Sequence, residues 1–334
     1  MTEQQSSILK WYKSNGRVLP WRGRQDPYHI WISEVMLQQT TSQAVVPFFE
    51  RFLNRFPTVA SLAQSDVGEV LELWSGLGYY SRARNLHKAA QALHLEKQFP
   101  KSYVKLLEMP GFGPYTSRAV SSLAFNENVG LVDGNAIRVL SRVYTMKSLW
   151  WSTKGRAEIQ EKADALVQGV DARDMNQALM DLGSMICTPT SPKCALCPWA
   201  KHCQANLEGN PEAYPPAKPK KQKMILAWYP IVEMGEKKKT LLLQKNDYAP
   251  FLKGQWLLPG HIKVLKKAPT KFLFKHTITH HDIYTVDIQK KHRAKIKQVG
   301  LQSQWVKMNE LARVCPVSLV SKAVQLAHPE YTKS

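Results

Sequence analysis

The chain has 334 residues, enough for two domains with separate cores, and its hydrophobic content of 44% is ordinary for a globular protein. It has no apolar run near the roughly 20 residues that cross a bilayer, and its first residues lack the apolar segment of a signal peptide. Lys and Arg total 46 against 26 Asp and Glu, a formal charge of +20. We therefore expect a soluble, cytoplasmic protein that does not act at a membrane. The positive charge favours nucleic acid as a polyanionic ligand, and a soluble basic protein without such a ligand is the alternative.

Residues 1–204 read as mostly helical, in short amphipathic pieces separated by Gly and Pro. Asp26 is placed to cap a helix that starts at Pro27 and continues through "YHIWISEVMLQQT". Two further helices are expected, at "SRARNLHKAAQALHL" (81–95) and, after "VDGN", at "AIRVLSRVY" (136–144). The first part of the chain is therefore predicted to be a helical domain.

The stretch "EMPGFGPYTSR" (108–118) interrupts this helical pattern with two glycines and two prolines, and so predicts a hairpin of two helices. Gly111 and Gly113 would let backbone N–H groups approach another surface, and the second helix would begin there with unpaired N–H groups. This arrangement suits an anion such as a DNA phosphate. A tight turn between two packed helices is the alternative.

Four of the five cysteines are crowded into "CTPTSPKCALCPWAKHC", with the spacing C-x6-C-x2-C-x5-C. In a chain without a secretion signal this crowding favours metal ligation over disulfides. Sulfur ligands alone suit either zinc or an iron–sulfur cluster. Cys315 lies far from the group and is expected to be a core thiol.

A proline- and lysine-rich segment, residues 205–224, is predicted to be a linker to a second domain at 225–334. There the pattern changes to short β-prone runs, "ILAWYPIV", "TLLLQK" and "DIYTVDI", followed by a helix-like "VSKAVQLA". We expect a smaller α+β domain.

The hairpin, the "VDGN" segment and the cysteine group, in that order, resemble the helix-hairpin-helix DNA glycosylase superfamily that includes endonuclease III. Within it, "LPWRGRQDPYHIWISEVMLQQT" (19–40) resembles the adenine DNA glycosylases of the MutY type. The resemblance implies a catalytic domain at 1–204 and a [4Fe–4S] cluster in the loop 187–203. Its ligands would be Cys187, Cys194, Cys197 and Cys203.

The same resemblance implies that Glu34 is the catalytic general acid, and apolar neighbours at helical spacing should favour its protonated form. Asp133 would stabilise the positive charge that develops at the sugar C1′, although it could simply cap a helix. Tyr115 stands where the strand-cleaving members carry a lysine, which implies a glycosylase without lyase activity. Tyr115 and Asn135 would position Asp133 and the attacking water.

Further positions match the family less specifically and could be ordinary surface or core residues. The resemblance places Arg17, Trp21, Arg22 and Asp181 at the base pocket, and Gln39 and Tyr79 around the extruded base. The expected DNA- and base-binding residues are Arg17, Trp21, Arg22, Gln38, Gln39, Tyr79, Gly111, Gly113, Asp181, Thr279 and His280.

The second domain resembles the Nudix-like domain with which the family reads 8-oxoguanine, and "KGQWLLPG" carries part of the likeness. The family's Phe-Ser-His loop is replaced here by Ile278-Thr279-His280, which keeps a hydroxyl and loses an aromatic face. No Glu-rich helix of the catalytic Nudix type is present in the sequence, so pyrophosphate hydrolysis is not expected.

The resulting hypothesis is a monomeric, nucleoid-associated base-excision-repair enzyme that removes adenine mispaired with 8-oxoguanine or guanine in double-stranded DNA. Two alternatives stay open. A thymine or uracil mismatch glycosylase would also carry Tyr115, but it would need neither Glu34 nor a lesion-reading domain. A DNA-binding iron–sulfur protein without catalysis would need neither Glu34 nor Asp133.

Overall fold

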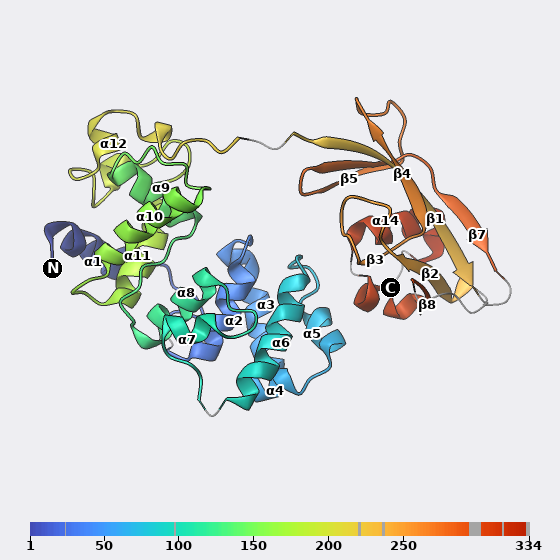
Figure 1. Ribbon diagram of the computed structural model, residues 1–334, viewed down its shortest axis with the longest axis horizontal. Helices are drawn as coiled ribbons and strands as arrows, with labels where there is room; N and C mark the ends of the chain where they lie inside the picture. Colours follow the sequence, from blue (N-terminus) through green and yellow to red (C-terminus); the bar gives the residue numbers. More distant parts are fainter. Residues whose placement is uncertain are drawn as a thin grey trace. The chain divides into compact units, whose positions relative to one another are not determined.

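The computed structural model describes residues 1–23, 25–96, 98–219, 222–235, 238–293, 302–315 and 317–331. The chain divides into two compact units, Met1–Lys218 and Pro219–Ser334 (Figure 1). The first unit is helical and the second is built on a sheet, so the mostly α and the α+β parts of the predicted fold class are confirmed.

The first unit is a set of short helices joined by turns (Figure 1). They are α1 (Glu3–Asn15), α2 (Pro27–Leu37), α3 (Ser42–Arg55), α4 (Val59–Ala63), α5 (Val67–Leu73), α6 (Ser81–Leu95), α7 (Tyr103–Leu107), α8 (Pro114–Phe125), α9 (Gly134–Val143), α10 (Thr153–Leu166), α11 (Ala172–Met185) and α12 (Gln204–Leu207).

Two hydrophobic cores hold these helices. One is built around α2, α3, α6 and α8 and includes Trp31, whose ring stacks on Phe112 at 5.0 Å between centroids. The other joins α1 to α9, α10 and α11 and encloses Trp199. Helices α8 and α9 are consecutive along the chain but belong to different cores, so the segment between them crosses from one core to the other.

Three helix predictions can be compared with the structure. The predicted helix 81–95 is α6, and the helix predicted at 136–144 is α9, which begins earlier, at Gly134, and ends at Val143. Asp26 caps α2, since its carboxylate accepts the backbone N–H of Tyr28 at 2.8 Å. The prediction that α2 runs on through "LQQT" is wrong, because α2 ends at Leu37 and Gln39 has a positive φ of 59°.

The predicted linker is partly packed in the structure. Residues 204–207 form α12, and the carbonyl oxygen of Tyr214 accepts a hydrogen bond from Arg142 Nε at 3.1 Å. Trp150 Nε1 donates to the carbonyl oxygen of Pro216 at 3.1 Å. This stretch is therefore held against the first unit by side chains of α9 and of the segment that follows it.

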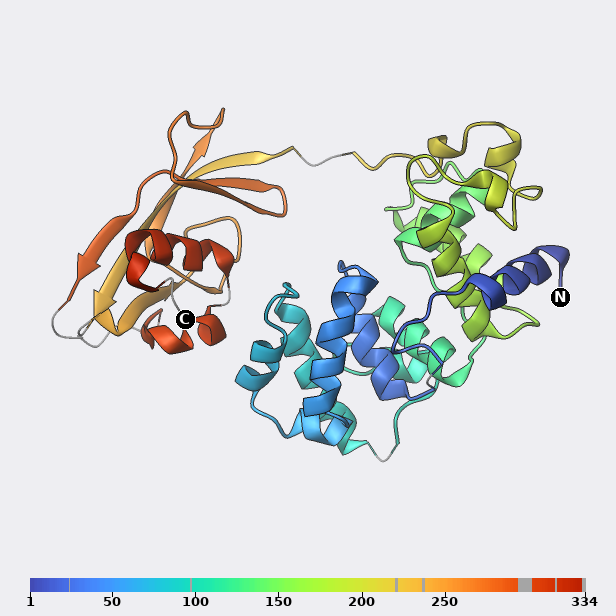
Figure 2. The ribbon, with the colours of Figure 1, turned by 180° about the vertical axis from the view of Figure 1, so that it is seen from behind.

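The second unit contains an eight-stranded mixed sheet. Its strands are β1 (Met224–Gly235), β2 (Thr240–Lys245), β3 (Trp256–Leu257), β4 (Gly260–Leu265), β5 (Phe274–Ile278), β6 (His281–Thr285), β7 (Gln289–His292) and β8 (Ser303–Lys307). The long strand β1 pairs antiparallel with β2 and β4 and parallel with β6 and β7. Helix α14 (Ser318–Ala327) covers one face of the sheet (Figure 2) and contributes Leu319, Val320 and Val324 to the core.

Strands β5 and β6 form a hairpin in which Ile278 pairs with His281, so Thr279 and His280 make up its two-residue turn. Thr279 has a φ of 54°. A positive φ is unfavourable for a β-branched residue and is found mainly where the surrounding structure enforces it. The turn that we expect to read the lesion is thus locally strained.

Candidate active site

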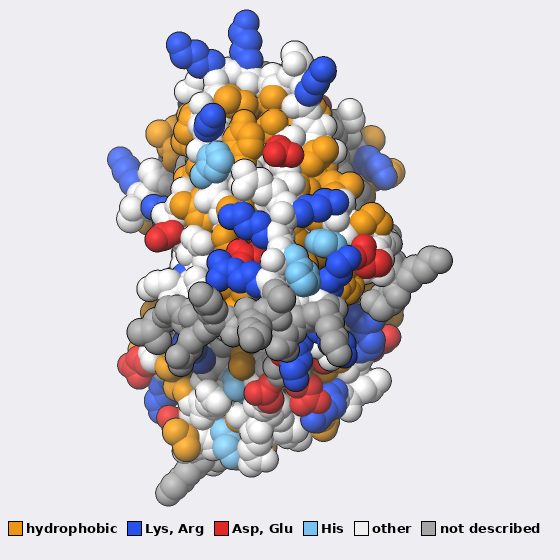
Figure 3. Space-filling view, turned by 90° about the vertical axis from the view of Figure 1, so that its right-hand side faces the viewer, with side chains coloured by type: hydrophobic (Ala, Val, Ile, Leu, Met, Phe, Trp, Pro, Cys, Tyr) orange, Lys and Arg blue, Asp and Glu red, His pale blue; other side chains and the backbone are white. Residues whose placement is uncertain are grey.

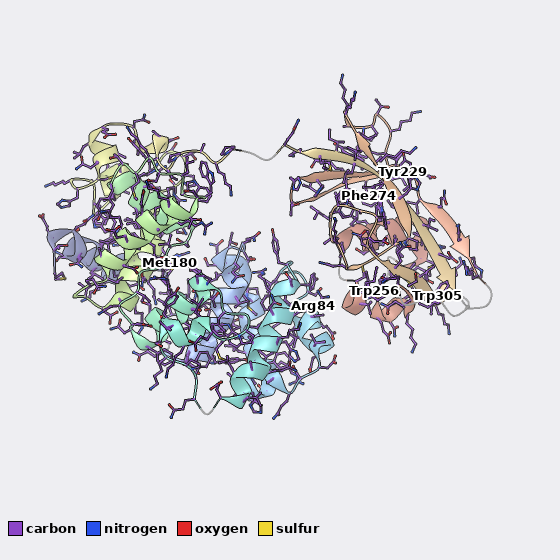
Figure 4. All side chains as sticks on the ribbon, in the orientation of Figure 1. Arg84, Met180, Tyr229, Trp256, Phe274 and Trp305 are labelled. Carbon is purple, nitrogen blue, oxygen red and sulfur yellow. The ribbon has the colours of Figure 1, made fainter. Side chains whose placement is uncertain are left out.

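A pocket of about 540 Å³ opens in the first unit between α2, α8, α9 and α11. It brings together residues that lie far apart in the sequence. Nine of the predicted site residues line it, namely Arg17, Trp21, Arg22, Glu34, Gln38, Gln39, Tyr115, Asp133 and Asn135. Met180 of α11, labelled in Figure 4, also lines it and was not predicted.

Glu34 enters the pocket from α2, a helix whose residues from Tyr28 to Met36 are almost all buried. The glutamate itself is only 5% exposed. Burial raises the pKa of Glu34 to about 7, with a smaller rise from the charge of Asp133, against the opposing effect of a hydrogen bond from Tyr115. A carboxyl group with this pKa is protonated in about half of the molecules at neutral pH, which makes it available as a general acid.

Tyr115 reaches the same point from the start of α8. Its hydroxyl donates a hydrogen bond to Glu34 Oε2 at 3.0 Å and lies 3.9 Å from the sulfur of Met180. Burial, and the charges of Glu34 and Asp133, raise the pKa of Tyr115 well above its usual value, so the phenol stays protonated and acts as a donor.

Asp133 caps α9 and faces the pocket at the same time. Its Oδ1 accepts the backbone N–H of Ala136 at 2.7 Å, and its Oδ2 accepts Nδ2 of Asn135 at 3.0 Å. Burial raises the pKa of Asp133, while these hydrogen bonds counteract the rise. The cap and the pocket lining therefore coexist, and Asn135 fixes the orientation of the carboxylate.

Asn135 is held in turn by Arg138, one turn further along α9. Arg138 Nη2 donates to Asn135 Oδ1 at 2.8 Å and to the carbonyl oxygen of Gly183 at 2.7 Å, and its Nε donates to the carbonyl oxygen of Cys187 at 2.7 Å. Gly183 allows close packing, since a Cβ there would lie 2.6 Å from Cβ of Asn135. Sequence reasoning did not predict that these side chains join Asp133 to the cysteine segment.

Asp181 does not line the pocket but is fully buried behind it. Its carboxylate accepts bonds from Arg17 Nε at 2.6 Å and from Arg22 Nη1 at 2.5 Å. Burial opposes ionisation of Asp181, but the hydrogen bond and charge of Arg22 outweigh it and lower the pKa. The carboxylate of Asp181 thus holds the two arginines at the pocket wall.

Gln39 and Tyr79 are both exposed, and both have left-handed backbones, with φ values of 59° and 51°. Tyr79 is not among the residues that line the pocket. Gln38 donates through Nε2 to Thr116 Oγ1 at 3.4 Å, which ties the end of α2 to α8. Positive φ values at non-glycine residues are uncommon and tend to occur at functional positions.

The two hairpin glycines differ in their surroundings. A Cβ on Gly111 would lie 3.1 Å from Ala89 Cβ, and the residue has a φ of 82°, so glycine is needed there for packing against α6. Around Gly113, the N-cap of α8, nothing lies within 4 Å of such a Cβ. The unpaired N–H groups at the start of α8 are therefore open to an anion.

The four cysteines of the predicted cluster are free thiols and line one small cavity together with Arg142. Arg142 Nη1 lies 3.3 Å from Cys187 Sγ. Among the described residues, no three His, Cys, Asp or Glu side chains are close enough together to hold a single metal ion. Thiols spread around a cavity beside a buried guanidinium suit an anionic cluster with several thiolate ligands better than one tetrahedral zinc ion.

Thr279 and His280 belong to the second unit, in the β5–β6 turn. Thr279 Oγ1 lies 3.4 Å from Nδ1 of both His280 and His281. Figure 3 shows one side of this unit, where Lys and Arg side chains are interspersed with hydrophobic ones.

Residues 32–168 match the model of the HhH-GPD superfamily of base excision DNA repair proteins. The chain is 35% identical over 298 residues to an adenine DNA glycosylase from Buchnera aphidicola subsp. Schizaphis graminum. The aligned region covers 84% of this chain and 85% of that protein. The chain belongs to the adenine DNA glycosylases. The family resemblance seen in the sequence is confirmed, and the protein is a DNA glycosylase enzyme of base excision repair.

The chain is also similar to a further curated protein and to solved structures. An adenine DNA glycosylase from Schizosaccharomyces pombe is 33% identical over 76% of this chain and 68% of its own length. A solved structure of a thermostable thymine-DNA glycosylase is 30% identical, with a TM-score of 0.57 over 62% of this chain and 97% of that one. An endonuclease III–DNA complex, 20% identical with a TM-score of 0.53, shares the fold. No helix in the described part of the chain is long and apolar enough to cross a membrane.

Proposed function

We propose that this glycosylase removes adenine mispaired with 8-oxoguanine or guanine in duplex DNA, by hydrolysing the N-glycosidic bond. The observation that carries the proposal is the buried Glu34 carboxyl, with its pKa of about 7, hydrogen-bonded to Tyr115 in a pocket that also contains Asp133. An aromatic base and a deoxyribose must both enter such a pocket, so the adenine has to leave the base stack first.

Adenine is a poor leaving group until N7 is protonated, and Glu34 is the acid that supplies this proton. Tyr115 holds Oε2 of Glu34. The proton is therefore available from the other oxygen. As the bond to the base lengthens, positive charge develops on C1′ and O4′ of the sugar. The carboxylate of Asp133, oriented by Asn135 and the N–H of Ala136, stabilises that charge.

Water then attacks C1′ and gives up a proton to Asp133, which leaves an abasic site and free adenine. No lysine is among the described residues that line the pocket. Tyr115 has no amine with which to form a Schiff base, so the enzyme is monofunctional. Gln39 and Tyr79 occupy the space vacated by the adenine, and Arg17, Trp21 and Arg22 contact the extruded base.

The second unit reads 8-oxoguanine on the opposite strand through Thr279 and His280. Its sheet and the helix α14 support a Nudix-like assignment, and α14 contains no glutamate. The strained backbone of Thr279 supports a functional role for the turn. The N-terminus of α8 at Gly113 binds a DNA phosphate.

The cysteine segment holds a [4Fe–4S] cluster through Cys187, Cys194, Cys197 and Cys203. When bound, the cluster supplies structural support to a basic loop. Purified protein should then be brown and contain iron and acid-labile sulfide. A colourless, active protein with stoichiometric zinc would overturn this assignment. Cys194→Ser should weaken folding of the loop, because cluster binding is coupled to its order.

One assay separates the main proposal from its rivals. Excision is measured on duplexes with A:8-oxoG, A:G, T:G and U:G pairs. The proposal requires adenine release from the first two. Release of thymine or uracil instead would identify the mismatch glycosylase. Binding without any excision would identify the non-catalytic DNA-binding protein.

A further inference from the structure

Arg82, in the first turn of α6, places its guanidinium among backbone carbonyl groups. Nη1 donates to the carbonyl oxygens of Val35 and Met36, both at 2.9 Å, and of Gln38 at 2.5 Å. Nη2 donates to those of Leu77 and Gly78, both at 3.3 Å. One side chain therefore bridges the end of α2 and the turn that precedes α6.

The η nitrogens of Arg82 are satisfied by these carbonyls, whereas its Nε is buried and has no hydrogen-bond partner among the described residues. Its guanidinium lies 5.6 Å from the ring centroid of Trp74 and 5.3 Å from that of Tyr79. In the described part of the chain no carboxylate pairs with it. A cation in the first turn opposes the dipole of its own helix, but here it lies at the negative, C-terminal end of α2. Its position is explained by α2 and not by α6.

Two of the five carbonyl groups that Arg82 contacts lie directly before residues with a positive φ. The carbonyl of Gln38 belongs to the peptide that leads into Gln39, and the carbonyl of Gly78 belongs to the peptide that leads into Tyr79. Gln39, which lines the pocket, and Tyr79, which does not, both have left-handed backbones. Because the orientation of a peptide plane is coupled to the φ of the next residue, a donor fixed on that carbonyl favours one φ over another.

We propose that Arg82 is a positioning residue, which holds Gln39 and Tyr79 in the conformations needed to fill the space of the extruded adenine. This inference rests on the proposed function, because it assigns the two residues a role only where a base leaves the stack. The left-handed backbones of these two residues are unfavourable and require a partner that enforces them. Arg82 is in contact with both segments and supplies that partner.

Lysine cannot replace arginine in this role. Its ammonium carries its three N–H donors on one nitrogen at the end of a flexible stem, whereas the guanidinium presents two separate nitrogens to the two segments. Arg82→Lys should therefore keep the charge and lose the bridge. Arg55→Lys is the matched control, because Arg55 makes a two-pronged contact with Glu69 on the surface, away from the pocket.

The experiment uses the full-length protein and an A:8-oxoG duplex with 2-aminopurine beside the target adenine. Fluorescence reports extrusion, and single-turnover kinetics report excision. Arg82→Lys should slow both by about tenfold or more, since small displacements of positioned groups have effects of this size. The pH at which excision is half-lost should stay at the wild-type value, because Glu34 is not altered. Arg55→Lys should match the wild type.

These readouts separate positioning from general destabilisation. A variant that is only less stable loses active protein, so its single-turnover amplitude falls while its rate constant is unchanged. Should Arg82→Lys fail to fold, Arg82→Gln removes the charge and tests the same bridge. A double-mutant cycle adds a second measure. Glycine adopts a positive φ freely, so in a Gln39→Gly background the effect of Arg82→Lys should shrink.

A rate constant and an extrusion signal within about twofold of the wild type would overturn the inference while leaving the proposed function in place. Full additivity of Arg82→Lys and Gln39→Gly would also overturn it, since independent sites add. A wild-type protein that excises no adenine would overturn the proposed function, and this inference with it.

Discussion

The hydroxyl of Tyr115 donates a hydrogen bond to Oε2 of Glu34 at 3.0 Å. This contact links α8 of the hairpin to the buried glutamate of α2. It favours the ionised form of the glutamate and so opposes the burial that raises its pKa. The balance leaves the pKa of Glu34 at about 7, where a carboxyl group can give up its proton during catalysis and regain it afterwards.

Replacing Tyr115 with phenylalanine removes this hydrogen bond, which lowers the pKa of Glu34. In Tyr115→Phe the pKa of Glu34 should rise above its wild-type value, so excision should persist to higher pH before it is lost. The pH dependence of single-turnover excision measures the shift. Tyr28→Phe is the control, since it also removes a buried hydroxyl, bonded to the carbonyl oxygen of Phe56. A fall in the apparent pKa of Tyr115→Phe would contradict the assignment.

Glu34→Gln should still bind the mismatch. Its rate of excision should fall by at least roughly 10²–10⁴-fold, which is the usual contribution of general acid catalysis. Excision within about tenfold of the wild type would remove Glu34 from the mechanism.

The same variant should change how stability depends on pH. The pKa of Glu34 is raised from 4.5 to about 7 in the folded state. Its contribution to stability is therefore fully present below about pH 4.5 and is lost as the pH rises through 7. Glutamine does not ionise, so Glu34→Gln should gain thermal stability relative to the wild type between pH 5 and pH 8, by at most about 3 kcal/mol. A difference between the two proteins that is independent of pH would show that Glu34 is not a desolvated acid.

Those parts of the site that depend on local sequence could be predicted. Asp26 as the cap of α2 and the apolar neighbours of Glu34 follow from spacing along one helix. The end of α2 at Leu37 could not be predicted, because its terminal carbonyls bond to Arg82, more than forty residues away. The link from Asn135 through Arg138 to the carbonyl of Cys187 also joins distant segments. Such contacts are set by how the helices pack, which a single sequence does not encode in any local pattern.

Substitutions of Thr279 in the strained β5–β6 turn can separate an effect on stability from an effect on lesion recognition. Thr279→Gly should relieve the positive φ and raise the thermal stability of this unit, by about 1 kcal/mol. It should also reduce the preference for A:8-oxoG over A:G pairs, because the hydroxyl is lost. Thr279→Ser keeps the hydroxyl and should keep the preference. If Thr279→Gly discriminates as well as the wild type, the turn does not read the lesion.

The absence of an amine at position 115 predicts the product left on DNA. Wild-type protein should leave an intact abasic strand that breaks only in hot alkali, and borohydride should trap little covalent complex. Tyr115→Lys places an amine beside Glu34, and some trapping and strand cleavage should appear. The neighbouring carboxylates favour the charged ammonium, which is not nucleophilic. On a duplex that already contains an abasic site, the double variant with Glu34→Gln should therefore trap more than Tyr115→Lys alone. Efficient trapping by the wild type would mean that a lysine from elsewhere reaches the sugar, and the monofunctional assignment would be wrong.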